Sequence, residues 1–168
     1  MHDERYSILY SSATGNTRLL ADTIRAALPP ELCDAFGAVG ETAAESELLY
    51  VGFWTDKGNA DADTLALLRT LKNKRLFLFG TAGFGVDTAY FDAILARVQA
   101  VPDGSNTVIG TYMCQGKMPP SVRARYEAMR VLPAPPENLD ALIENFDRAR
   151  THPDADDRDR LRAAVLHA

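Results

Sequence analysis

Short apolar runs alternate with helical patterns along this chain, and this alternation restricts the fold more than any other feature of the sequence. Runs with strand character occupy residues 5–10, 31–36, 48–53, 76–79 and 107–113. Between them, apolar residues recur every three or four positions, as they do on one face of an amphipathic helix. Strands that alternate with helices form a parallel sheet, because a crossover between parallel neighbours usually contains a helix. We therefore expect an α/β fold with a five-stranded parallel sheet and helices on both faces.

Three helical patterns follow the last strand run. Apolar residues at helical spacing in 139–146 predict a helix that faces the core. Residues 118–132 predict an extra helix before it, and residues 154–167 predict a helical tail whose early aspartates suit a helix N-terminus. A chain of 168 residues fits one domain, residues 1–168, with its core at about residues 4–149.

Composition argues against several classes of function. The formal net charge of −5 opposes a broad nucleic-acid-binding face. The sequence has no apolar leader and no run of 18 apolar residues, so we expect a cytoplasmic protein without a membrane span. Cys33 and Cys114 match neither a disulfide framework nor a metal-binding spacing. Ser11 and Ser12 lack a base partner, and we expect neither catalytic residues nor a metal site.

The loop after the first strand is rich in hydroxyl and amide side chains and leads directly into a helix. Doubly wound sheets bind ligands at the carboxyl ends of their strands, where helix N-termini offer free N–H groups to a phosphate. The loop has neither the lysine of nucleotide triphosphate loops nor the three spaced glycines of dinucleotide folds. It suits a terminal monophosphate held by hydrogen bonds, although an ordinary turn and helix cap is the alternative.

Residues 12–17, Ser-Ala-Thr-Gly-Asn-Thr, resemble the phosphate-loop pattern of the flavodoxin family, Ser/Thr-x-Thr-Gly-Asn-Thr. The resemblance extends through all five strands to about residue 149. It implies a flavodoxin-like three-layer sandwich with strand order 2-1-3-4-5, and FMN as cofactor. It places the FMN phosphate in this phosphate loop, among Ser12, Ala13, Thr14, Gly15, Asn16 and Thr17. Ala13 stands where many flavodoxins have a hydroxyl, so only its backbone N–H remains as a donor.

The resemblance also assigns the loop after the third strand to the flavin, through Trp54, Thr55, Asp56, Lys57 and Gly58. Flavodoxins have an aromatic residue and a glycine-containing turn here, and an indole can stack on the isoalloxazine ring. Gly58 lets a peptide turn its carbonyl towards flavin N5, with the Thr55–Asp56 peptide as the alternative. Trp54 could instead be a core residue at the end of a strand.

The loop after the fourth strand completes the flavin site that the resemblance implies. Flavodoxins use the N–H groups of this loop at the pyrimidine edge of the flavin. The corresponding residues are Thr81, Ala82, Gly83, Phe84 and Gly85. Phe84 would cover the second face of the ring, with Tyr90 as the alternative. The other interpretation is a turn whose Phe84 packs in the core.

Residues 51–58, 79–85 and 110–119 resemble one branch of short bacterial flavodoxin-family proteins, a branch that includes the flavodoxin-like partner of a bacterial bilirubin reductase. The resemblance implies a one-electron carrier that docks on a redox partner protein, a reductase or another oxidoreductase. The alternative is an FMN-dependent quinone or small-molecule oxidoreductase, with residues 118–132 as a wall beside the flavin. A flavin-free module that binds another anion is a third interpretation.

Overall fold

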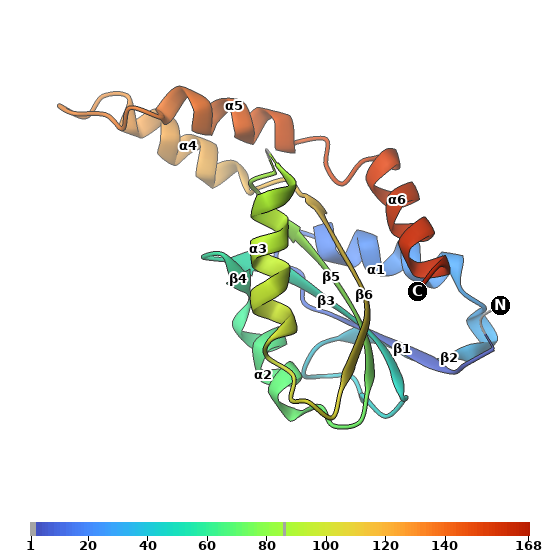
Figure 1. The fold of residues 1–168 in the computed structure, drawn as a ribbon. Helices are drawn as coiled ribbons and strands as arrows, with labels where there is room; N and C mark the ends of the chain where they lie inside the picture. Colours follow the sequence, from blue (N-terminus) through green and yellow to red (C-terminus); the bar gives the residue numbers. More distant parts are fainter. Residues whose placement is uncertain (1–2, 86) are drawn as a thin grey trace.

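Five parallel strands form the centre of the computed structural model, which describes residues 3–85 and 87–168. They are β1 (Tyr6–Tyr10), β2 (Cys33–Ala38), β3 (Leu48–Asp56), β5 (Arg75–Ala82) and β6 (Thr107–Gln115). Their spatial order is β2-β1-β3-β5-β6, which is the expected order 2-1-3-4-5 once a short additional strand is set aside. The predicted α/β class and the parallel sheet are therefore confirmed (Figure 1).

The short additional strand corrects the predicted strand count from five to six. It is β4 (Asn59–Ala60), which pairs antiparallel with the end of β3. The two residues between these strands, Lys57 and Gly58, have φ angles of 51° and 79°. Positive φ at both central residues is the geometry of a tight two-residue hairpin turn. The predicted loop after the third strand is thus largely a β-hairpin.

Strand boundaries also differ from the expectation, and the differences at β5 and β2 change the local structure most. β5 continues to Ala82, so Thr81 and Ala82 are strand residues and not loop residues. At β2, the expected first residues instead belong to a 3-10 turn, η1 (Pro30–Leu32), and the strand begins at Cys33. Pro30 has no N–H group to give to a strand ladder, and its fixed φ suits the start of a helical turn.

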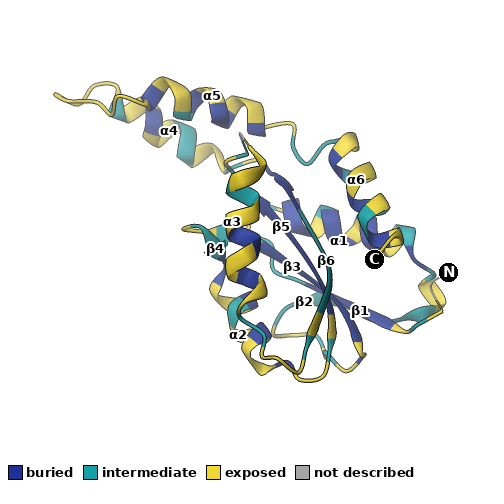
Figure 2. Cartoon of the chain, in the orientation of Figure 1, coloured by how far each residue is buried: buried dark blue, intermediate teal, exposed yellow. Residues whose placement is uncertain are grey.

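Helices cover both faces of the sheet. Successive strand residues point to opposite faces, and the buried residues on each face need a covering layer. The helices are α1 (Asn16–Ala27), α2 (Ala62–Thr70), α3 (Thr88–Gln99), α4 (Pro120–Met129), α5 (Leu139–Ala149) and α6 (Ala155–Leu166). One core cluster joins Tyr50 and Phe77 to residues of α1 and α6. The other joins Val51 and Leu78 to residues of α2 and α3. Figure 2 shows the buried strands between these two helical layers.

The helix predicted to face the core, α5, does not cover the sheet. It packs against α4, and the two helices share a small cluster built on Tyr126, Leu139, Ile143 and Phe146. Figure 1 shows this α4–α5 hairpin reaching away from the sheet. The helix that packs beside α1 is instead α6, and its Leu161 and Val165 are fully buried in the main core. The predicted extra helix and helical tail are therefore present, but the tail forms part of the sandwich. Among the described residues, no helix combines the length and apolar character needed to cross a membrane.

The start of α6 leads to a prediction about stability at acid pH. The Asp154 carboxylate accepts a hydrogen bond from the N–H of Asp157, and this bond, helped by nearby His152, lowers the pKa of Asp154. A lowered folded-state pKa stabilises the fold above the ordinary pKa of about 3.9, and that contribution disappears as pH falls through the folded value. Asp154→Ala should therefore lower the melting temperature at pH 7 and have much less effect near pH 2. Thermal unfolding followed by circular dichroism at both pH values tests this, with Asp159→Ala as a control on the same helix. An equal effect of Asp154→Ala at both pH values would contradict it.

Candidate functional site

A cavity of about 360 Å³ opens at the carboxyl ends of the central strands. We call it the strand-end cavity. Some of the predicted site residues line it, namely Ala13, Thr14, Asn16, Thr17, Trp54, Thr55, Thr81, Ala82 and Gly83. The structure thus brings together three segments that lie far apart in the sequence. It also adds residues 116 and 117, which the sequence analysis did not assign to the site, and residues 118 and 119, from the segment that the alternative interpretation placed as a wall beside the flavin.

The phosphate loop is shaped by its own side chains and by one glycine. Gly15 has a φ of 88°, which an L-residue rarely adopts, and it turns the chain into α1. The hydroxyl of Ser12 accepts hydrogen bonds from the N–H groups of Gly15 (3.1 Å) and Arg18 (3.4 Å). Gly15, at the N-cap of α1, has no side chain to accept a hydrogen bond, and among the described residues no side chain accepts from the N–H groups of Asn16 and Thr17. The N–H groups of Asn16 and Thr17 therefore point from a helix start with no side-chain acceptor, which is an arrangement that binds anions.

The hydroxyl of Thr17 holds the phosphate loop on the sheet. The residue is fully buried, and its hydroxyl donates to the carbonyl oxygen of Phe53 (3.1 Å) and lies 3.4 Å from the hydroxyl of Thr81. With its proton directed to Phe53, this side chain positions α1, and Thr17 can offer an anion its backbone N–H.

Only some of the predicted site residues in the β3–β4 hairpin line the strand-end cavity. Trp54 and Thr55 line the cavity, and the Thr55 hydroxyl donates to the carbonyl oxygen of Thr81 (2.8 Å). Asp56, Lys57 and Gly58 do not line it. The Gly58 carbonyl accepts a hydrogen bond from the Arg97 guanidinium on α3 at 2.7 Å. The structure therefore ties the Gly58 carbonyl to α3.

The residues after β5 are fixed by a network of buried amides. The carbonyl oxygen of Gly83 accepts hydrogen bonds from Gln115 Nε2 and Asn145 Nδ2, both at 3.0 Å. Phe84 is 39% exposed, lies outside the cavity and meets Tyr90 edge to face, with ring centroids 6.5 Å apart. Gly85 also lies outside the cavity lining. This side of the site therefore presents backbone at Ala82 and Gly83, without an aromatic ring of the kind that Trp54 offers opposite.

Residues 116–119 cross the cavity and contact the phosphate loop, and we call them the cover segment. The Gly116 N–H donates to the Ala82 carbonyl at 2.9 Å. The Lys117 carbonyl accepts hydrogen bonds from Asn16 Nδ2 (2.8 Å) and from the Thr14 hydroxyl (3.4 Å). The sequence feature that could have identified this segment is its place directly after the last parallel strand, at the ligand-binding edge of the sheet. Its contacts with a loop 100 residues away depend on the tertiary fold.

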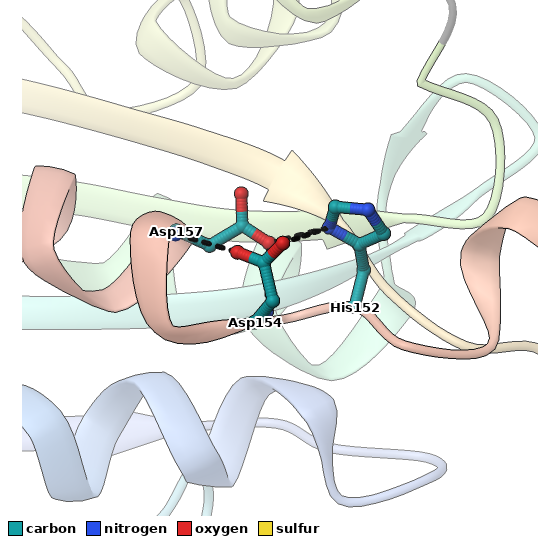
Figure 3. A group of neighbouring side chains, drawn as sticks. All are labelled: His152, Asp154 and Asp157. Atoms are coloured by element: carbon teal, nitrogen blue, oxygen red, sulfur yellow. Dashed lines mark hydrogen bonds and ion pairs between the residues drawn. The ribbon is translucent and has the colours of Figure 1, made fainter.

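A cluster of His152, Asp154 and Asp157 lies at the start of α6 (Figure 3). Its possible metal-ligand atoms lie within 4.8 Å of one another. Asp157 Oδ2 is already held by His152 Nδ1 (2.6 Å) and by the Asp154 N–H (2.9 Å). The bond from the Asp154 N–H, together with the bond from the Asp157 N–H to Asp154 Oδ1, forms a capping box for α6, and these contacts explain the cluster without an ion. The His152 carbonyl in turn accepts a hydrogen bond from the Lys117 N–H at 3.0 Å.

Cys114 packs in the main core near the end of β6. It is 3% exposed, and burial raises the pKa of its thiol far above the ordinary range. A thiol held in its protonated form is a poor nucleophile. Cys114 therefore has a structural role in the core.

Three comparisons place the chain among known proteins. Residues 7–166 match the family model described as a flavodoxin domain. A flavodoxin-like domain-containing protein BilS from Clostridium symbiosum is 42% identical over 91% of this chain and 90% of that protein. The protein of the same name from Clostridioides difficile is 30% identical over 88% of this chain and 86% of its own length. A flavoprotein from Lactobacillus acidophilus, solved in complex with FMN, is similar in fold, with a TM-score of 0.52 and 18% identity over 66% of this chain and 93% of that one.

Proposed function

The chain belongs to the flavodoxin family, and from this premise we propose that it binds FMN in the strand-end cavity and transfers electrons through it. One observation carries the proposal. The cavity joins the free N–H groups at the start of α1 to the Trp54 side chain on the far side of β3. An anion site and an aromatic wall at the same strand ends suit the phosphate and the ring of FMN, respectively.

The donor set of the cavity fits FMN. The N–H groups of Ala13, Asn16 and Thr17 would hold the phosphate, while Trp54 would stack against the flavin ring. Backbone at Ala82 and Gly83 lets the polar edge of the ring approach without meeting a large side chain. When bound, FMN supplies a centre that accepts and releases one or two electrons. The protein residues orient it and shield it from water.

The side chains of Thr14 and Asn16 have a second role in this proposal. Both donate to the Lys117 carbonyl, so they release the cover segment when they turn to a phosphate. A phosphate accepts stronger, charge-assisted hydrogen bonds than a neutral carbonyl does. FMN binding is therefore expected to loosen the contact between the cover segment and the phosphate loop.

We propose a redox partner protein, a reductase, as the physiological electron donor or acceptor. The 42% identity to a protein named BilS supports this, together with the resemblance to the branch that includes the partner of a bilirubin reductase. The alternative, an FMN-dependent small-molecule oxidoreductase, is favoured by a second cavity beside the flavin site. The free thiols of Cys33 and Cys114 support a reducing compartment such as the cytoplasm.

Stepwise anaerobic reduction of the FMN-loaded protein tests the proposal. Saturable binding, with a new long-wavelength absorption band after about one electron per flavin, would support a one-electron carrier. Direct bleaching by two electrons would favour the oxidoreductase. Failure of added FMN to bind would overturn the central proposal.

Removal of the Trp54 ring should weaken the binding of any flavin. Stacking contributes about 0.5–1.5 kcal/mol beyond simple burial, so Trp54→Ala should weaken binding by about two- to tenfold or more. The loss should be equal for FMN and riboflavin, because the ring is common to both. Quenching of flavin fluorescence measures both affinities, and Trp54→Phe serves as the conservative control. A loss confined to FMN would place Trp54 away from the ring.

A further inference from the structure

We propose that a second cavity, between the phosphate loop and the α4–α5 hairpin, binds a small organic anion with an apolar body. Its volume is about 530 Å³, which exceeds that of the strand-end cavity and lies in the range of small-molecule sites. Its apolar wall includes Met118, Pro119 and Phe146, and its cationic side chains are Lys117, Arg123 and Arg150. We call it the hairpin cavity.

The charges around the hairpin cavity select an anion. None of its lining residues is acidic. Arg123 is compensated, because Asp147 accepts two hydrogen bonds from its guanidinium at 3.0 Å and Glu127 accepts a third at 2.7 Å. The same ion pair lowers the pKa of Asp147. Arg150 forms a longer ion pair with Asp147, at 3.6 Å and without a hydrogen bond, and no described residue forms an ion pair with Lys117. Two cations thus remain available to a ligand.

The walls of the hairpin cavity favour a flat apolar body attached to that anionic group. The Arg150 guanidinium lies over the Phe146 ring, 5.7 Å from its centroid, which combines a cation with an aromatic surface. Pro119 and Pro120 add rigid apolar surface at the start of α4. Arg123, on α4, is held in place by Asp147 on α5, so the part of the wall that Arg123 forms is fixed before a ligand binds. A wall that is already fixed lowers the entropic cost of binding.

The hairpin cavity lies directly beside the proposed flavin site. Thr14, Met118 and Pro119 line both cavities, so the two share a wall. Met118 also packs closely on Gly83, where an added Cβ would lie 2.7 Å from its sulfur. A ligand in the hairpin cavity would therefore lie next to the proposed flavin site, separated from it by the flexible thioether side chain of Met118. Arg123, Phe146 and Arg150 line the hairpin cavity but not the strand-end cavity, so occupation of the hairpin cavity does not require FMN.

Amide chemical-shift mapping with 1-naphthoate as the probe tests this inference. The ¹⁵N-labelled protein is titrated with the probe in the presence and absence of FMN. Shifts are expected to concentrate in residues 117–123 and 146–150 under both conditions. The neutral naphthalene-1-carboxamide should bind at least about tenfold more weakly, because it lacks the charge that Lys117 and Arg150 recognise.

Variants of the two available cations provide the decisive comparison. The double variant Lys117→Gln with Arg150→Gln should weaken naphthoate binding by about tenfold or more. Arg125→Gln, an exposed charge on α4 outside the cavity, should leave binding unchanged. Shifts that map elsewhere, equal binding of the carboxamide, or an unaffected double variant would overturn the inference. A failure of FMN to bind would appear separately in the flavin titration and would leave this result intact.

Discussion

Gly116→Val is expected to weaken FMN binding by about ten- to a hundredfold. A Cβ at position 116 would lie 2.5 Å from Nδ2 and 2.9 Å from Cγ of Asn16, so the Asn16 side chain must move. Asn16 is only 7% exposed, so a side chain displaced by the added Cβ can no longer turn freely towards the phosphate. A hydrogen bond to a charged group contributes about 1.5–3 kcal/mol, and each 1.4 kcal/mol changes affinity tenfold. Titration of FMN by fluorescence quenching measures the loss.

Riboflavin and a second glycine variant show whether that loss arises at the phosphate loop. Riboflavin lacks the phosphate, so Gly116→Val should change its affinity much less than that of FMN. Gly104→Ala is a matched control, because no atom lies within 4 Å of a Cβ added there. Equal losses for FMN and riboflavin would mean that the cover segment supports the ring, and that Asn16 does not bind the phosphate.

Leu161→Ala is expected to cause a large loss of stability. Leu161 lies in α6, is fully buried, and belongs to the main core with Leu20 and Ile24 of α1. Truncation of a buried leucine to alanine costs about 2–5 kcal/mol. For a protein of this size that corresponds to a melting temperature lower by about 4–20 °C. Thermal unfolding by circular dichroism measures the shift.

The matched control for Leu161→Ala lies on the same helix. Leu166 is 50% exposed, so Leu166→Ala removes the same atoms with little loss of packing. Its melting temperature should stay close to that of the wild type. Similar shifts in the two variants would contradict the docking of α6 on the sandwich, since only a docked helix distinguishes its two faces.

The structure also changes the interpretation of the chain after β6. A pattern of apolar residues shows that a helix has a buried face, but it does not show which partner covers that face. Residues 139–146 carry a clear apolar face and were expected to cover the sheet, yet they pack on α4. α6 covers the sheet although its apolar face is narrower, because Leu161 and Val165 reach the space beside α1. The α4–α5 hairpin is thus placed next to the flavin-binding edge, where it forms one wall of the hairpin cavity.

The sequence by itself determined the α/β class, the five parallel strands and the family, because these depend on local apolar patterns and on one contiguous motif. The family resemblance also made Thr14, Asn16, Trp54 and Gly83 candidates, and each follows a predicted strand at the ligand-binding edge. Only the tertiary structure decided that Gly58 is tied to α3 and that the cover segment contacts the phosphate loop. Those contacts join residues 39 to 101 positions apart, and no local pattern records which distant groups meet when the chain folds.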